Sequence, residues 1–208
     1  MSVSGVLRRR LNRRKATGPL ADLYDTSVQP RRWLSVDVET TGLDPAKDRL
    51  LSIGWVPVDD NEIVLAGAGH VILWNDSNES VGESATVHGI TDDVIAMGTD
   101  PQDAVGQVLE ALKGRALLAH YAKMELGFLD KACRQYFGAG FDVPADDTMD
   151  REYRAMTAKN REPSREGLRL WTLLENYGLP PSKAHHALND AIAAAEIWLA
   201  QNSHGLPK

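Results

Sequence analysis

The stretch SVDVETTGLDP, residues 35–45, places two carboxylates inside an apolar run. Asp37 and Glu39 are separated by one valine, and a small turn containing glycine follows them. A strand is predicted to begin at Trp33, and side chains at positions i and i+2 of a strand share a face. Both carboxylates therefore project side by side. An isolated pair of this kind also fits the polar outer side of a half-exposed strand, so it does not define a site alone.

Two further acids lie on the apolar faces of predicted helices. Glu125 falls within the apolar arc of the helix predicted over 121–137, whose lysines and arginines point away from it. Asp190 faces the core side of the helix predicted over 187–200, near its positive N-terminal end. Either acid alone is also explained by a helix-end charge or an internal hydrogen bond. Together with the strand pair, they are explained most economically by one shared site, because an inward carboxylate is costly unless paired or metal-bound.

Four gathered carboxylates repel one another, and divalent cations relieve that repulsion. Hard oxygen ligands favour Mg²⁺ or Mn²⁺ over zinc, and the sequence has no Cys/His cluster that would compete. His185 precedes Asp190 by five residues, so we expect it in the turn that enters the last helix. From there it can lean over the site as a neutral general base. For His186 we expect a surface position.

The composition is that of an ordinary globular protein. The chain has 208 residues, 43% hydrophobic and 25% charged, which suits one domain. No apolar run approaches the ~20 residues of a membrane helix. Cys133 is the single cysteine, which excludes internal disulfides and fits a reducing compartment. We therefore expect a cytoplasmic protein that does not associate with membranes.

The net charge of −6 conceals an asymmetry. Residues 1–32 hold eight lysines and arginines against two aspartates, or +6, so the remaining residues carry −12. The basic extension over 1–32 is predicted either to help hold nucleic acid or to be a solvated or partner-docking extension. The acidic body argues against wide electrostatic wrapping of DNA or RNA.

The order of predicted elements indicates an α/β layer with a mixed sheet. The predicted strands span 33–38, 50–58, 62–73, 116–119 and 141–143. The predicted helices span 92–96 (capped by Thr91), 101–113 (ended by Gly114), 121–137, 148–159, 168–177 and 187–200.

Taken in order, these segments resemble the histidine branch of the DEDD superfamily of 3′→5′ exonucleases, which includes the epsilon proofreading subunit of bacterial DNA polymerase III. The first family motif, D-x-E-T-T-G-L, stands intact at 37–43, and the third, H-x-A-x-x-D-A, at 185–191. A His-Gly-Ile-Thr segment at 88–91 and an Asp-Thr pair at 147–148 also match. The second motif, usually H-N-A-x-x-D, reads HYAKME at 120–125. Tyr121 and Glu125 therefore depart from the family pattern, and we expect weakened or retuned activity.

The resemblance implies an α/β, RNase H-like (exonuclease) fold, with a mixed five-stranded β-sheet flanked by α-helices, over residues 33–204. It implies that two divalent metal ions, Mg²⁺ or Mn²⁺, are held by four acids: Asp37, Glu39, Glu125 and Asp190. It makes His185 the general base. It implies that the substrate is contacted by Thr40, Leu43 and His88.

The activity that the resemblance implies is hydrolysis of terminal phosphodiesters of single-stranded DNA to 5′-mononucleotides. The implied partners are the 3′ end of single-stranded DNA and a DNA polymerase or other replication or repair protein. Two alternatives stay open. One is an RNA-trimming enzyme similar to RNase T or oligoribonuclease. The other is a non-catalytic, polymerase-associated module that only binds nucleic acid.

Overall fold

A mixed β-sheet forms the centre of the protein, whose structure is a computed structural model that describes residues 3–75, 89–182 and 185–206. The strands are β1 (Arg32–Thr40), β2 (Leu50–Asp59), β3 (Glu62–Ile63), β4 (Gly69–Ile72), β5 (Ala116–Ala119) and β6 (Ala145–Asp147). Their order is β3-β2-β1-β5-β6, and β4 also pairs with β2. β1 runs antiparallel to β2 and parallel to β5, so the predicted mixed sheet is confirmed.

The predicted strand over 62–73 is split into β3 and β4 by a 3₁₀ turn, η1 (Leu65–Gly67). Pro57 of β2 explains the break. It accepts a hydrogen bond from the N–H of Val64 (2.9 Å) but has no N–H to return one. The ladder therefore stops after Ile63 and resumes at Gly69, opposite Trp55. β3 and β4 therefore both lie beside β2, so the six strands occupy five positions across the sheet.

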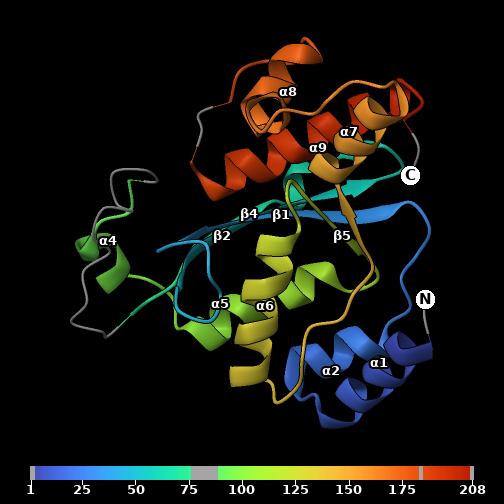
Figure 1. Ribbon diagram of the computed structural model, residues 1–208. Coiled ribbons are helices and arrows are strands. Elements are labelled where there is room, and N and C mark those ends of the chain that lie inside the picture. The colour runs from blue at the N-terminus through green and yellow to red at the C-terminus, as the bar shows by residue number, and fades with distance from the viewer. Residues whose placement is uncertain (1–2, 76–88, 183–184, 207–208) are drawn as a thin grey trace.

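Helices cover both faces of the sheet (Figure 1). One face carries α2 (Gly18–Asp25), α5 (Pro101–Leu112) and α6 (Lys123–Tyr136), with α1 (Val3–Lys15) beside α2. The other face carries α7 (Thr148–Ala158), α8 (Leu170–Asn176) and α9 (Ala187–Ser203). The short helices α4 (Asp92–Ala96) and η3 (Glu166–Leu168) complete the described elements. Among the described residues, no helix has the length and apolar character needed to cross a membrane.

Alternate side chains of β1 point to the two opposite faces of the sheet. Leu34, Val36 and Val38 are buried in the cluster that includes α2, α5 and α6. Cys133 lies in the same cluster. On the opposite face, Ser35 donates a hydrogen bond to the backbone carbonyl of Ala191 in α9 (2.7 Å). The face that carries Asp37 and Glu39 is therefore the one covered by α9, as the period of two predicts.

Part of the basic N-terminal segment packs into the domain. Leu20, Leu23 and Tyr24 of α2 are buried in the main core cluster. The hydroxyl of Tyr24 donates to the carbonyl of Gly140 and accepts from the N–H of Asp142 (3.0 Å). The division of the chain after residue 32, and a role for 1–32 in binding nucleic acid, stay predictions.

The strand predicted over 141–143 is wrong, because the last strand lies at 145–147. Phe141 is buried, which is why its sequence resembles a strand, but its N–H donates to the Asp130 side chain of α6 (2.8 Å). Side chains thus take the backbone donors that a sheet would need. Two smaller corrections concern helices: the segment 168–177 is divided into η3 and α8, and Thr91 precedes α4 without a side-chain hydrogen bond.

Candidate active site

Three of the four predicted acids converge. Carboxylate oxygens of Asp37 and Glu39 from β1 and of Asp190 from α9 all lie within 4.8 Å of one another. Asp190 is 7% exposed and Glu39 is 9% exposed. Acids that are about 150 positions apart in the chain are therefore brought to one place by packing the start of α9 against β1.

A glycine makes this packing possible. Gly54 of β2 pairs directly with Asp37, so the two positions share the face covered by α9. A Cβ on Gly54 would lie 2.1 Å from the backbone nitrogen of Leu188 and 2.2 Å from the carbonyl carbon of Ala187. Only glycine lets the first turn of α9 approach the sheet so closely. Gly54 is not among the residues predicted for the site, although a glycine inside an apolar strand signals close backbone approach.

Glu125, in the first turn of α6, lies near this cluster but outside the group within 4.8 Å. It is 2% exposed, and its Oε2 has no hydrogen-bond partner among the described residues. Its charge acts on Asp37, which places Glu125 close to the cluster although outside that group.

Burial raises the pKa values of all four acids, and the charges of neighbouring site acids raise those of Asp37 and Glu39 further. Burial, followed by the charges of Glu125, Asp190 and Glu39, raises the pKa of Asp37 well above its usual range. Burial and then Asp190 raise the pKa of Glu39 to about 7.

For the other two acids, burial is the dominant cause. Burial is the largest cause of the raised pKa of Glu125, with a further contribution from the charge of Asp147. Burial also raises the pKa of Asp190, although the backbone N–H of His185 and the neighbouring imidazoles of His185 and His186 act in the opposite direction. The metal-free site is therefore electrostatically unfavourable when these groups are ionised.

His185 occupies the predicted entry turn of α9. Its backbone N–H donates to Oδ2 of Asp190 (2.9 Å), and its φ of 61° lies in the left-handed region. Its half-buried ring contacts the ring of Trp171, with centroids 5.6 Å apart. His186 is exposed, as predicted, and stacks on the ring of His70 with centroids 4.5 Å apart.

The carboxylate oxygens of the site are suited to binding divalent cations. Oδ1 of Asp190 and Oε2 of Glu125 are buried oxygens without a hydrogen-bond donor among the described residues. A buried acceptor left in this state costs about 1–3 kcal/mol. Bound cations remove that cost, and carboxylate oxygens are the ligands that Mg²⁺ and Mn²⁺ prefer.

The loop after β1 carries the predicted substrate-binding residues. Thr40 ends β1 and donates through its hydroxyl to the carbonyl of Gly42 (2.6 Å). Leu43 is 76% exposed, so its side chain is available to a ligand. Asp48 holds the loop closed, because its carboxylate accepts from the N–H of Asp44 (2.8 Å). His88 lies outside the described residues.

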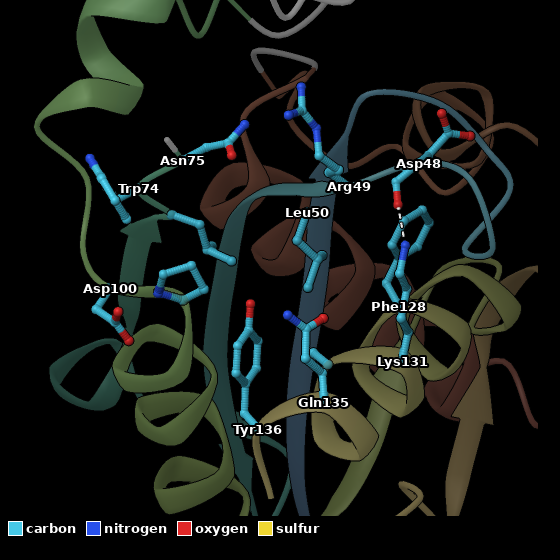
Figure 2. Close-up of a pocket in the computed structure, with 13 residues that line it drawn as sticks. Asp48, Arg49, Leu50, Trp74, Asn75, Asp100, Phe128, Lys131, Gln135 and Tyr136 are labelled. Atoms are coloured by element: carbon cyan, nitrogen blue, oxygen red, sulfur yellow. Dashed lines mark hydrogen bonds between the residues drawn. The ribbon is translucent and has the colours of Figure 1, made fainter. Parts of the chain in front are cut away.

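A cavity of about 410 Å³ lies beside this loop (Figure 2). Its lining includes Arg49, Phe128 and Tyr136, and none of the four acids. Figure 2 shows Lys131 of α6 extending towards Asp48, whose backbone carbonyl accepts its hydrogen bond at 2.9 Å. Lys131 thus ties the loop that carries Leu43 to the helix that carries Glu125.

The altered second motif has an unusual backbone. Tyr121 has a φ of 68°, and α6 begins only at Lys123, later than predicted. The N–H groups of Tyr121 and Ala122 donate to the carboxylate of Asp147 (3.0 and 2.9 Å), which also caps α7. Asparagine adopts the left-handed backbone conformation more readily than tyrosine, which accounts for the asparagine that is usual at this position of the second motif.

Comparisons with known proteins identify the family of the chain. The model of a family described as exonuclease, of the RNase T type, matches residues 34–198. The chain belongs to this exonuclease family. The resemblance to DEDD exonucleases drawn from the motifs is therefore confirmed.

Relatives include PolC-type DNA polymerases III. The polymerase of Thermotoga petrophila is 29% identical over 176 residues, which cover 85% of this chain. That of Thermotoga maritima is 26% identical over 175 residues, and that of Staphylococcus haemolyticus 25% over 176. In each case the match covers only 12% of the polymerase.

Solved structures of E. coli exonuclease I share the fold. A zinc-bound complex of that enzyme with single-stranded DNA superposes with a TM-score of 0.71 at 16% identity, covering 85% of this chain and 41% of the enzyme. Its complex with a dT13 oligonucleotide gives a TM-score of 0.70, also at 16% identity, over 83% of this chain and 41% of the enzyme. The predicted RNase H-like fold is confirmed by these matches.

Proposed function

We propose that this chain is a metal-dependent 3′→5′ exonuclease that releases 5′-mononucleotides from single-stranded DNA. The observation that carries the proposal is the convergence of Asp37, Glu39 and Asp190 within 4.8 Å, in a chain of the exonuclease family. The unpartnered oxygen of Asp190 supports a cation there.

Asp37, Glu39, Asp190 and Glu125 are the residues that would hold the metal. Their four negative charges balance two divalent ions, and this balance supports two Mg²⁺ or Mn²⁺ rather than one. When bound, such ions act as Lewis acids that activate water and offset the charge developing on phosphodiester oxygens.

His185 is the proposed general base. Its backbone is fixed by the hydrogen bond to Asp190, and its ring lies at the start of α9 rather than within the core. An imidazole in this position accepts the proton of the attacking water. The exposed Leu43 and the end of β1 at Thr40 are the proposed contacts to the terminal nucleotide, and the sequence adds His88.

The relatives favour DNA over RNA. The polymerases that match are DNA polymerases, and the structural neighbours were solved with single-stranded DNA. Because the matched region is a small part of each polymerase, we propose that the chain works with a DNA polymerase or another replication or repair protein. A cytoplasmic location follows from that role.

The test is digestion of a 5′-labelled single-stranded oligonucleotide with Mg²⁺, Mn²⁺ or chelator. We expect a descending ladder that requires metal, and no ladder from Asp37→Asn or Asp190→Asn. An oligonucleotide that is bound but stays intact with Mn²⁺ would favour the non-catalytic module. A matched RNA degraded about tenfold faster than DNA would overturn the substrate assignment.

A further inference from the structure

Trp171 is an exposed tryptophan beside the proposed catalytic histidine. It lies in the first turn of α8 and is 42% exposed. Its ring meets the ring of His185 at 5.6 Å between centroids, with the planes at 70°. This edge-on arrangement is a favourable one for two aromatic rings. A surface position of a short helix would otherwise suit a polar residue, so the tryptophan needs a reason.

The helix that carries Trp171 packs against α9. Leu170, Leu173 and Leu174 of α8 are buried in one cluster with residues of α9. The two helices therefore move together, and the Trp171 side chain keeps its place relative to the start of α9. Asp190 lies in the first turn of α9.

Trp171 also contacts a cation. The guanidinium of Arg169 lies 5.5 Å from the centre of the Trp171 ring, a cation–π contact. Arg169 is itself paired with Glu166, at 3.1 Å between Nε and Oε2. The tryptophan thus contacts both a cation and an imidazole.

The imidazole of His185 has few other restraints. Its backbone is anchored by the hydrogen bond to Asp190, but its ring makes no hydrogen bond to any part of the chain that the structure describes. The imidazole is close enough to Asp190 to interact with it electrostatically, and rotation of the side chain would change that separation. The ring of Trp171 lies against the imidazole and opposes such rotation.

We propose that Trp171, supported by Arg169, is a positioning residue that holds the imidazole of His185 towards the carboxylate cluster. This inference rests on the proposed role of His185 as general base. A base must lie within hydrogen-bond reach of the water it deprotonates, and small displacements lower the rate steeply. Trp171 therefore acts on turnover through His185, and not by binding nucleic acid.

The experiment is a double-mutant cycle on the full chain, with single-stranded DNA and Mn²⁺. We expect Trp171→Ala to lower kcat on the order of 10- to 100-fold and to change KM less than about twofold. Trp171→Phe, which keeps an aromatic ring, should retain most of the rate. In a His185→Ala background, Trp171→Ala should cost nothing further, because residues that act as one unit are not additive. Tyr153→Ala, which removes another exposed aromatic side chain, is the control.

A second readout does not depend on activity. In the proton NMR spectrum, the ring current of Trp171 shifts the His185 ring resonances, and Trp171→Ala should remove that shift while leaving the resonances of His204 unchanged. Manganese affinity should also stay unchanged. These measurements distinguish lost positioning from general unfolding.

Each contrary outcome has a distinct meaning. An equal loss from Trp171→Ala with and without His185 would overturn the inference. So would a raised KM at unchanged kcat, which would identify Trp171 as a platform for a nucleobase. A slow His185→Ala with a full-rate Trp171→Ala would overturn the inference alone. A full-rate His185→Ala would overturn the proposed base, and the inference with it.

Discussion

Replacement of Gly54 with alanine tests whether the first turn of α9 lies directly on the sheet. The added Cβ would lie 2.1 Å from a backbone nitrogen of α9, where ordinary contacts begin at 3.4 Å. The difference of about 1.3 Å must be met by moving α9 or β2, since both neighbours are backbone and cannot rotate away. Overpacking of this kind costs typically ~1–3 kcal/mol, and the backbone contact places Gly54→Ala at the upper end.

The same displacement separates Asp190 from Asp37 and Glu39. A shift of about 1 Å in catalytic geometry lowers rates on the order of 10²-fold. We therefore expect Gly54→Ala to lose about 3 kcal/mol in the free energy of unfolding, measured with urea, and most of its metal-dependent digestion of single-stranded DNA.

Gly106→Ala is the matched control. Gly106 lies inside α5, and a Cβ there would meet its nearest atom at 3.7 Å. Alanine should stabilise this helix by roughly 0.5–1 kcal/mol and leave digestion unchanged. If Gly54→Ala keeps wild-type stability and rate, then α9 does not approach the sheet as described, and the account of how the acids converge is wrong.

Three further predictions concern the site. In chelator, the melting temperature should rise as the pH falls from about 8 to about 6, because a carboxyl with a raised folded pKa, such as Glu39 at about 7, takes up a proton on folding. Saturating Mg²⁺ should raise the melting temperature at about pH 8 and make the melting temperature less dependent on pH. A metal-free protein whose melting temperature does not change between these pH values would contradict the prediction. Glu125→Gln should stabilise the metal-free protein in the same assay, because it removes a buried charge that acts on Asp37, and should weaken Mn²⁺ binding measured by calorimetry; unchanged affinity would place Glu125 outside the metal site. Tyr121→Asn should raise the free energy of unfolding by about 0.5–1 kcal/mol, because asparagine tolerates the left-handed backbone; urea titration would show a loss instead if the tyrosine ring contributes packing that outweighs the strain.

Periodicity alone predicted the faces of the acids. The period of two placed Asp37 and Glu39 on one side of β1, and the helical period turned Asp190 inward. Carboxylate oxygens of all three residues lie within 4.8 Å of one another. These predictions succeed because the direction of a side chain follows from the regular backbone that carries it.

Features that depend on contacts between elements were not predicted. The role of Gly54 depends on which helix lies over it, and the break at Pro57 depends on which side of β2 the missing N–H faces. The apolar run at 141–143 is buried like a strand, but side chains of distant residues bind its backbone. Asp147 joins the starts of two helices, which a single segment cannot reveal.

The acids that define the site also oppose the fold that gathers them. Without metal, burial raises the pKa of each carboxylate, and repulsion between the acids raises the pKa of Asp37 and Glu39 further. Ionising the acids of the metal-free protein at neutral pH and above therefore costs folding free energy. The close approach at Gly54 and the hydrogen bond from Ser35 to Ala191 hold α9 in place against that repulsion. Cation binding should then release most of the stored cost, which couples metal affinity to folding. Variants that loosen α9 should therefore lose metal affinity and stability together, whereas loss of an acid should lower metal affinity while stabilising the metal-free chain.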